Sequence, residues 1–372
     1  MFRSYSQFLS AILLLLTSVF CSSVFADDNG KNLAVDKVKG DLSVMVLGSG
    51  GPIATEVGRA SASYLIFIKG KPKILMDAGG GAFQRLAASG TDIKDLDIIL
   101  LSHLHIDHMG DLSPMVKTMY FHNRVANVDP AQPEYHFPPG RTAKFRVFGP
   151  NQNGITFANT PIAAIADPAT TQYPSSSAFV NSHYDVNHGD ERYMWLFSRA
   201  ISAGIFGYEV TDVSPNWQAF NPETIIDDED GLTIKAVGVP HGPVPALAFR
   251  IEYKGKTIVY SGDTSSMGNN MGLISAGADL LIYDTALFFN APPADRPDLN
   301  IFYMLHTTPA KIGQVANQAD AKTLVLSHIT PQSEGKFDEI KGMIRAEGYK
   351  GKIKVAKDLK VYNLMPEDDD EE

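Results

Sequence analysis

The chain is almost without cysteine: Cys21 is the only one among its 372 residues. A framework of disulfides is therefore excluded, and so is a zinc site built from thiolates. If an N-terminal leader is cleaved after Ala26, as argued below, the mature chain has no cysteine at all. Any metal ion must then be held by histidine and carboxylate side chains.

Basic residues are also in short supply. The chain has 32 Lys and Arg residues against 42 Asp and Glu residues, which gives a formal net charge of -10. Proteins that bind nucleic acid contact its phosphates through clustered Lys and Arg. Because we find neither such an excess nor a long basic arm, the composition predicts that nucleic acid is not a partner.

Long apolar runs are confined to the start of the chain. Arg3 is the only charge before the apolar stretch Phe8–Phe20, and small residues follow that stretch. This order is typical of a secretory signal peptide, here residues 1–26. A membrane anchor is the alternative, because residues 4–26 are about long enough to span a bilayer; a lipoprotein at Cys21 is less favoured. We expect a periplasmic or secreted protein with no membrane contact after cleavage.

Strands and helices alternate along residues 27–365, which we predict to form one domain. The apolar patterns predict strands at 42–47, 64–68, 73–76, 96–101, 232–239, 246–253, 257–260, 280–283, 323–326, 352–355 and 359–364. They predict helices at 82–89, 111–119, 309–319 and 337–347. Two β-rich halves with helices between and outside them indicate an α/β fold, a four-layer αβ/βα sandwich.

Residues 121–221 differ from the rest in being rich in Pro, Ser, Asn and aromatics. We predict an insertion here that could fold over a functional site. Its aromatic side chains would suit an aromatic leaving group, or they simply pack the insertion or a homodimer contact; they are Tyr184, Tyr193, Trp195, Phe197, Phe206 and Tyr208. Residues 366–372 are a run of acids and are expected to form a disordered tail.

Four side chains able to bind a metal lie within six residues, directly after the apolar run 96–101. They are His103, His105, Asp107 and His108. In an extended segment, residues two apart point the same way, so the first two can share one metal. A turn would let the other two face a neighbouring metal. Imidazole and carboxylate suit zinc, although iron or manganese would also fit.

Three more candidates each follow a predicted strand directly. His241 lies in Val-Pro-His-Gly-Pro, Asp263 in Tyr-Ser-Gly-Asp-Thr and His328 in Leu-Ser-His-Ile-Thr. The first cluster has the same placement at the end of a strand. Ligands repeated at one edge of a sheet sandwich predict a site with two metals.

These motifs resemble the metallo-β-lactamase superfamily over about residues 42–364, and within it ribonuclease Z and the zinc arylsulfatases. The likeness is carried by Leu-Gly-Ser-Gly-Gly-Pro (47–52), Asp77-Ala-Gly, Leu-Ser-His-Leu-His-Ile-Asp-His-Met-Gly-Asp (101–111), Ser-Gly-Asp-Thr (261–264), Ala-Asp-Leu-Leu-Ile-Tyr-Asp-Thr-Ala-Leu (278–287), His306-Thr-Thr-Pro-Ala and Ala356-Lys-Asp-Leu-Lys-Val-Tyr.

The resemblance implies a set of ligands. One zinc would be held by His103, His105 and His241, the other by Asp107, His108 and His328, with Asp263 bridging the two and Asp77 supporting the ligands. Two zinc ions would generate hydroxide from a shared water at neutral pH. Asp107 could also accept the proton of that water.

The resemblance also implies a role for His306, which is not needed as a ligand and is free for acid or oxyanion work. Ribonuclease Z-like enzymes orient an equivalent histidine with a glutamate. The matching position here is Asp284, in Tyr-Asp-Thr-Ala where the family reads His-Glu-Ala-Thr. The shorter carboxylate is a departure from the family pattern.

We therefore expect an exported dinuclear-zinc hydrolase of ester bonds, acting on a small sulfate or phosphate ester by metal-bound hydroxide. A lactonase or β-lactamase-type hydrolase is the alternative, because it would use the same metals. A ribonuclease Z-type endonuclease at tRNA 3′ ends is less favoured, because the acidity and the leader oppose it. The expected partner is a small ester, and a homodimer is possible.

Overall fold

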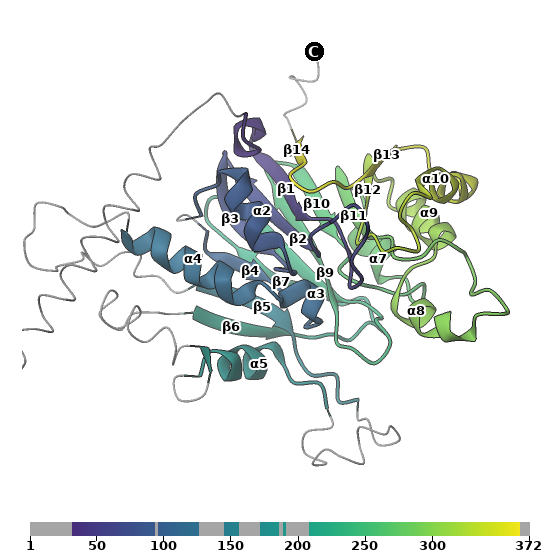
Figure 1. Ribbon diagram of the computed structural model, residues 1–372, viewed down its shortest axis with the longest axis horizontal. Coiled ribbons are helices and arrows are strands. Elements are labelled where there is room, and N and C mark those ends of the chain that lie inside the picture. Colours follow the sequence, from purple (N-terminus) through teal and green to yellow (C-terminus); the bar gives the residue numbers. More distant parts are fainter. Residues whose placement is uncertain are drawn as a thin grey trace, which may run out of the picture.

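The computed structural model describes residues 32–93, 96–125, 145–155, 172–185, 189–190 and 208–364. Within them, two seven-stranded sheets pack face to face (Figure 1). The expected leader (1–26) and acidic tail (366–372) lie outside the described residues. Among the residues that are described, none of the helices is long and apolar enough to cross a membrane.

The first sheet has the order β14-β1-β2-β3-β4-β5-β6. Its strands from β14 to β3 pair antiparallel, and those from β3 to β6 pair parallel. The bounds are β1 Leu42–Gly48, β2 Ser63–Ile68, β3 Lys71–Met76, β4 Ile98–Leu100, β5 Phe145–Pro150, β6 Tyr208–Val213 and β14 Val361–Leu364.

The second sheet has the order β13-β12-β11-β10-β9-β8-β7. Strands β10 to β13 are parallel, and β7 to β10 are antiparallel. The bounds are β7 Glu223–Asp227, β8 Thr233–Gly238, β9 Leu247–Tyr253, β10 Lys256–Tyr260, β11 Leu280–Asp284, β12 Thr323–Ser327 and β13 Lys352–Val355.

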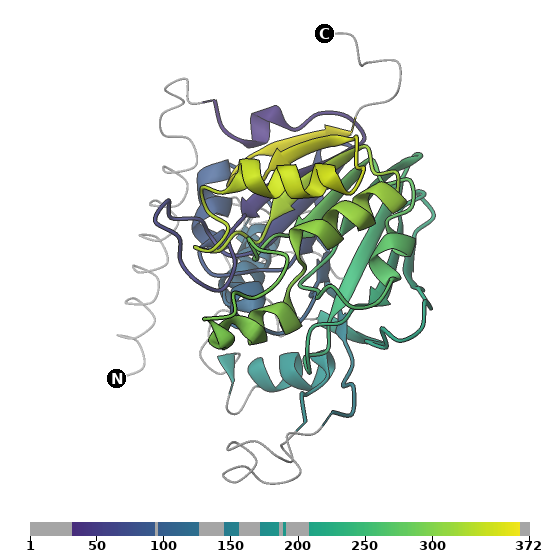
Figure 2. The ribbon, with the colours of Figure 1, turned by 90° about the vertical axis from the view of Figure 1, so that its right-hand side faces the viewer.

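Helices cover both outer faces. Figure 1 shows α2, α4 and α5 on the side of the first sheet, and Figure 2 shows α9 and α10 in front of the second. The helices are α2 Ala82–Ser89, α3 Ile106–Met109, α4 Leu112–Val125, α5 Ser176–His183, α7 Asn270–Ile274, α8 Asn300–Leu305, α9 Pro309–Gln318 and α10 Phe337–Ala346, with short 3-10 turns η1 Val35–Lys37 and η3 Pro297–Leu299.

Three apolar clusters fill the spaces between these layers. In β1, Val44 and Val46 point toward the second sheet, whereas Met45 and Leu47 point toward the helices. A third cluster joins the second sheet to α7, α9 and α10. Because β1 is buried on both faces, it reads as a continuous apolar run rather than an alternating one. The four-layer α/β sandwich expected from the sequence is confirmed.

No strand or helix was predicted within residues 121–221, but the described part of this segment contains regular structure. It contributes β5 and β6, two parallel strands at the edge of the first sheet, and α5 packed against them. Strand β6 escaped notice because it is half exposed and carries polar residues, Tyr-Glu-Val-Thr-Asp-Val. Tyr184 and Tyr208 pack in the helix-side cluster; Tyr193, Trp195, Phe197 and Phe206 lie outside the described residues.

Candidate metal centre

The predicted ligands meet at one edge of the sandwich. Strands β3 and β4 of the first sheet are parallel, as are β10, β11 and β12 of the second. Their carboxyl ends bring together Asp77, the His103–His108 cluster, Asp263, Asp284 and His328. Strand β8, two antiparallel steps from β10, delivers His241 to the same edge.

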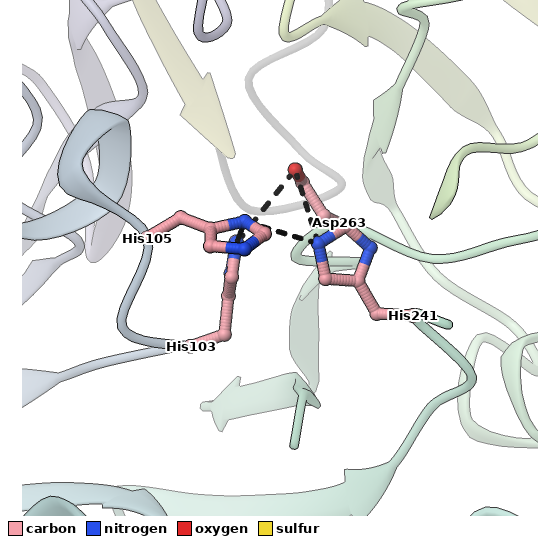
Figure 3. Close-up of side chains that lie close together, drawn as sticks. All are labelled: His103, His105, His241 and Asp263. Atoms are coloured by element: carbon pink, nitrogen blue, oxygen red, sulfur yellow. Dashed lines mark hydrogen bonds and ion pairs between the residues drawn. The ribbon is translucent and has the colours of Figure 1, made fainter. Parts of the chain in front are cut away.

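The first group joins three histidines and Asp263 (Figure 3). His105 Nδ1 lies 3.0 Å from His103 Nε2 and 3.3 Å from His241 Nε2. Asp263 Oδ2 is 3.8 Å from His103 Nε2 and 3.9 Å from His241 Nε2. A tetrahedral zinc with ligands at about 2.0–2.1 Å holds them about 3.3 Å apart, so the nitrogen spacing fits such an ion.

The second group joins Asp107, His108, Asp263 and His328. His328 Nε2 is 3.1 Å from Asp107 Oδ2 and 3.2 Å from Asp263 Oδ1. His108 Nε2 is 3.2 Å from the same Asp263 oxygen. The two oxygens of Asp263 therefore face different groups, Oδ2 the first and Oδ1 the second, which is the arrangement of a bridging carboxylate.

Two buried atoms in the second group show that the residues fit a cation. His108 Nε2 and Asp263 Oδ1 are both buried, and neither makes a hydrogen bond among the described residues. Unpaired buried polar atoms are costly in an apolar interior. Because both atoms belong to residues with metal-ligand chemistry, a bound cation is the partner that would satisfy them.

Hydrogen bonds on the far side of each ring fix which nitrogen faces the site. His108 donates through Nδ1 to Asp77 Oδ2 at 2.7 Å, and His241 donates through Nδ1 to the carbonyl of Leu305 at 2.8 Å. A carboxylate and a carbonyl can only accept, so Nδ1 carries the proton in both rings. The lone pair of Nε2 then points into the metal group.

Asp77 anchors the site from below. Its carboxylate also accepts hydrogen bonds from Ser102 N and Oγ, each 2.7 Å away, and from the Tyr260 hydroxyl at 2.8 Å. Sequence reasoning found Asp77 but missed Ser102 and Tyr260. Their positions, one residue before His103 and three before Asp263, were the available signal.

The two groups differ in charge. Burial lowers the pKa of His103 and lowers that of His241 to about 3, so both rings are neutral and can donate a lone pair. Burial alone would also lower the pKa of His328, but the Asp263 charge and hydrogen bonds to Asp107 and Asp284 raise it to about 10. The second group is therefore rich in negative charge, and a divalent cation would replace the protons held there.

His306 lies beside both groups, and together with Asp263, Asp284 and His328 it forms a third set of side chains close enough to hold a metal ion. Its ring centroid is 5.2 Å from that of His328 and 5.7 Å from that of His241. Nδ1 lies 2.8 Å from Asp284 Oδ2, so Asp284 reaches His306 despite being shorter than glutamate. Burial would raise the pKa of Asp284, but the His306 charge and hydrogen bonds from His306 and His328 hold it below its usual value.

Asp107 has the same balance of effects. Burial alone would raise its pKa, but the nearby charges of His108 and His328 and the hydrogen bond from His328 Nε2 at 3.1 Å hold it far below the usual range. The carboxylate is therefore ionised at neutral pH, as a metal ligand must be.

A second cluster of reactive side chains lies away from this site. Ser113 Oγ is 2.7 Å from His183 Nε2 and 2.5 Å from Asp190 Oδ2. In a nucleophilic triad the carboxylate would contact the other ring nitrogen, Nδ1. Here Ser113 Oγ and Asp190 Oδ2 both lie beside His183 Nε2, and Ser113 Oγ donates a hydrogen bond directly to Asp190. The cluster is therefore not arranged for nucleophilic catalysis.

Comparison with known proteins agrees with the fold and the site. The model of the metallo-beta-lactamase superfamily matches residues 57–287, more than half of the chain. The chain belongs to this superfamily, and it is a metal-dependent hydrolase.

Similar proteins cover nearly the whole chain. A protein named Ribonuclease Z from Mycobacterium bovis (strain BCG / Pasteur 1173P2) is 27% identical over 326 residues, 87% of this chain and 99% of that protein. Ribonuclease Z from Mycobacterium tuberculosis (strain ATCC 25618 / H37Rv) is 26% identical over the same length.

Solved structures share the fold. The short form of human tRNase Z has a TM-score of 0.57 at 19% identity, covering 87% of this chain and 99% of that one. The metallo-beta-lactamase fold protein YhfI from Bacillus subtilis has a TM-score of 0.54 at 21% identity, covering 86% and 98%.

The relatives correct two expectations drawn from the sequence. The expected small sulfate or phosphate ester substrate was wrong, and so was the exclusion of nucleic acid as a partner, because the relatives that span the chain are named as ribonucleases. The net charge of -10 does not exclude nucleic acid as a partner, because it is a property of the whole chain and not of one site. At a metal centre, divalent cations rather than Lys and Arg can neutralise phosphate.

Proposed function

We propose that this protein is a dinuclear zinc ribonuclease that hydrolyses a phosphodiester bond at the 3′ side of precursor tRNA. The observation that carries the proposal is the His306–Asp284 pair, joined at 2.8 Å beside two metal-ligand groups that share Asp263. The likeness of 87% of the chain to proteins named Ribonuclease Z supports RNA as the substrate.

The ligand assignment follows the two groups. His103, His105 and His241 would hold one zinc, Asp107, His108 and His328 the other, and Asp263 would bridge them. Mixed imidazole and carboxylate donors at tetrahedral spacing favour zinc over magnesium or calcium, which prefer oxygen ligands alone. When bound, the two ions supply hydroxide at neutral pH and neutralise charge on the phosphate oxygens.

The chain's own residues would complete the reaction. Asp107 accepts the proton of the attacking water. His306 has Nδ1 tied to Asp284, so Nε2 is the nitrogen free to protonate the leaving ribose oxygen. Thr307 Oγ1 donates to the carbonyl of Thr264 at 2.6 Å and so ties the His306 loop to the loop that carries Asp263.

The test uses zinc-loaded protein with a precursor tRNA that carries a 3′ trailer, and p-nitrophenyl sulfate as a small ester. We expect a single cut at the trailer and no hydrolysis of the sulfate ester. The His306→Ala variant should cut the precursor tRNA more slowly than the wild type. Intact precursor after long incubation, or faster turnover of the aryl sulfate, would overturn the proposal.

Export is a separate proposal, and it concerns residues 1–26, outside the described part of the chain. The charged start and short apolar core of the leader support it. Fractionation of cells and the N-terminal sequence of the mature chain test it: a chain starting at Asp27 in the periplasm or medium is expected, and an intact Met1 in the cytoplasm would contradict it.

A further inference from the structure

Asp358 lies in the sequence Ala-Lys-Asp-Leu-Lys-Val-Tyr (356–362), which takes no part in the proposed reaction. Its carboxylate accepts four hydrogen bonds. Oδ1 accepts from Ser49 N at 3.1 Å and Ser49 Oγ at 2.7 Å, and Oδ2 accepts from Ala60 N and Arg85 Nε, each at 2.9 Å. Asp358 thus joins the chain after β1, the chain before β2 and helix α2, and its side chain is only 13% exposed.

Arg59 holds Ser49 from the other side. One guanidinium nitrogen donates to Ser49 Oγ at 2.9 Å and to the carbonyl of Ala356 at 2.8 Å. The other two donate to the carboxylate of Glu334, at 2.7 and 3.2 Å. Ser49 is therefore held between the Asp358 carboxylate and the Arg59 guanidinium. Arg59 is in turn paired with Glu334, in the turn after β12.

The segment held in this way pairs with the residue next to a metal ligand. Ile329 N donates to the carbonyl of Ser49 at 2.9 Å, and Gly51 N donates to the carbonyl of Ile329 at 3.0 Å. The imidazole of His328 packs on Gly51, where a Cβ would come within 2.8 Å of His328 Cε1. The segment Ser49–Gly51 thus pairs with Ile329 through its backbone and packs against the His328 ring through Gly51.

His328 needs such support because its backbone is strained. Its φ is 57°, in the left-handed region, which is unfavourable for a residue with a Cβ. A strained conformation persists only when its surroundings enforce it. The hydrogen bonds on both sides of Ile329 hold this backbone in place from one side, and the bond from Thr285 N to the carbonyl of Ser327 holds it from the other.

We propose that Asp358 is a positioning residue for His328, which acts by clamping Ser49–Gly51 against Ile329. It sets the geometry of the group Asp107, His108, Asp263 and His328. None of the hydrogen bonds described for Asp358 or Ser49 involves His103, His105 or His241, so the clamp does not hold the histidines of the other group. The inference rests on the metal centre of the proposed function but not on its RNA substrate.

The first experiment is zinc titration of full-length Asp358→Asn against a chromogenic chelator. The amide keeps the size of the side chain but places an NH2 group against N–H and O–H donors. We expect two zinc ions in the wild type, and in the variant one unchanged ion and one bound about 10–100-fold more weakly, the range found when residues behind a ligand are changed.

Asp97→Asn is the matched control. Asp97 is also a mostly buried carboxylate, 16% exposed, that pairs with Lys73 and Arg146, but it lies before β4, at the end of that strand away from the ligands. This variant should lose stability and keep both zinc affinities. Equal effects of the two substitutions on zinc would reduce Asp358 to a general structural role and overturn the inference.

A double-mutant cycle with His328→Ala, read out as zinc affinity, distinguishes positioning of His328 from a general structural role. In that background Asp358→Asn should weaken zinc binding no further, because both changes act on one ligand. Additive losses, or equal weakening of both ions in Asp358→Asn, would overturn the inference.

If Asp358→Asn does not fold, Arg59→Gln, which breaks the Glu334 side of the clamp, should show the same selective loss in a milder form. A wild type that binds no zinc would refute the metal centre itself along with this inference.

Discussion

Asp77 Oδ2 lies 2.7 Å from His108 Nδ1, and this contact decides which nitrogen of His108 faces the second metal group. The same carboxylate accepts from Ser102, next to His103, and from Tyr260, near Asp263. One buried side chain thus orients residues that arrive from both sheets. The left-handed φ of 53° at Asp77 is the strain that accompanies this position.

Asp77→Asn should weaken metal binding about 10–100-fold, because the amide can present an NH2 group to His108 Nδ1 and so favour the wrong tautomer. Zinc affinity measured by competition with a chelator checks this. Asp279→Asn is the control, since Asp279 accepts from Thr257 N at the opposite end of β11. Wild-type affinity in Asp77→Asn would show that the tautomer is set by something else.

His306→Ala should lower kcat on precursor tRNA by about 10²–10⁴-fold, the usual contribution of a general acid. KM and zinc content should stay close to the wild-type values, because His306 is not among the assigned ligands. Asp284→Asn should give a smaller loss in kcat. Single-turnover cleavage together with metal analysis distinguishes this from a ligand defect, in which zinc content would fall along with kcat.

Gly51→Ala should selectively weaken the zinc that His328 binds, because the added Cβ would meet the His328 ring at 2.8 Å. Gly80→Ala is a close control: a Cβ there meets nothing within 4 Å. Zinc titration of both variants is the measurement. Identical titrations of Gly51→Ala and the wild type would mean that the ring can shift at no cost to the metal.

Alkaline pH should destabilise the protein through buried tyrosines such as Tyr64. Burial raises the pKa of Tyr64 above its usual value, even though the contact with Ser327 Oγ at 2.7 Å acts in the opposite direction. The unfolded chain ionises near pH 10 while the folded one does not. The contribution of this group to stability is therefore complete below about pH 10 and is lost as the pH rises above it.

Denaturant unfolding at a series of alkaline pH values tests this sign. Tyr64→Phe should reduce the loss of unfolding free energy above about pH 10, whereas Ser327→Ala, which keeps the phenol, should retain it. A Tyr64→Phe variant as alkali-sensitive as the wild type would contradict the assignment.

The sequence by itself determined the ligand types, their order and their placement at the ends of strands. It also determined the layers, because runs such as Leu42–Leu47 record burial on both faces of a strand through local pattern alone. Helix α2 and strand β13 fall at the residues predicted for them. These properties depend on neighbours along the chain, which a sequence displays directly.

Only the tertiary structure decided which residues meet. The contact of Asp77 with Tyr260 spans 183 positions and that of Ser49 with Asp358 spans 309. Such pairs depend on how two sheets stack, and periodicity carries no record of it. The same limit applied to Asp284: its shorter side chain departs from the family pattern, yet in the folded chain it lies 2.8 Å from His306 Nδ1.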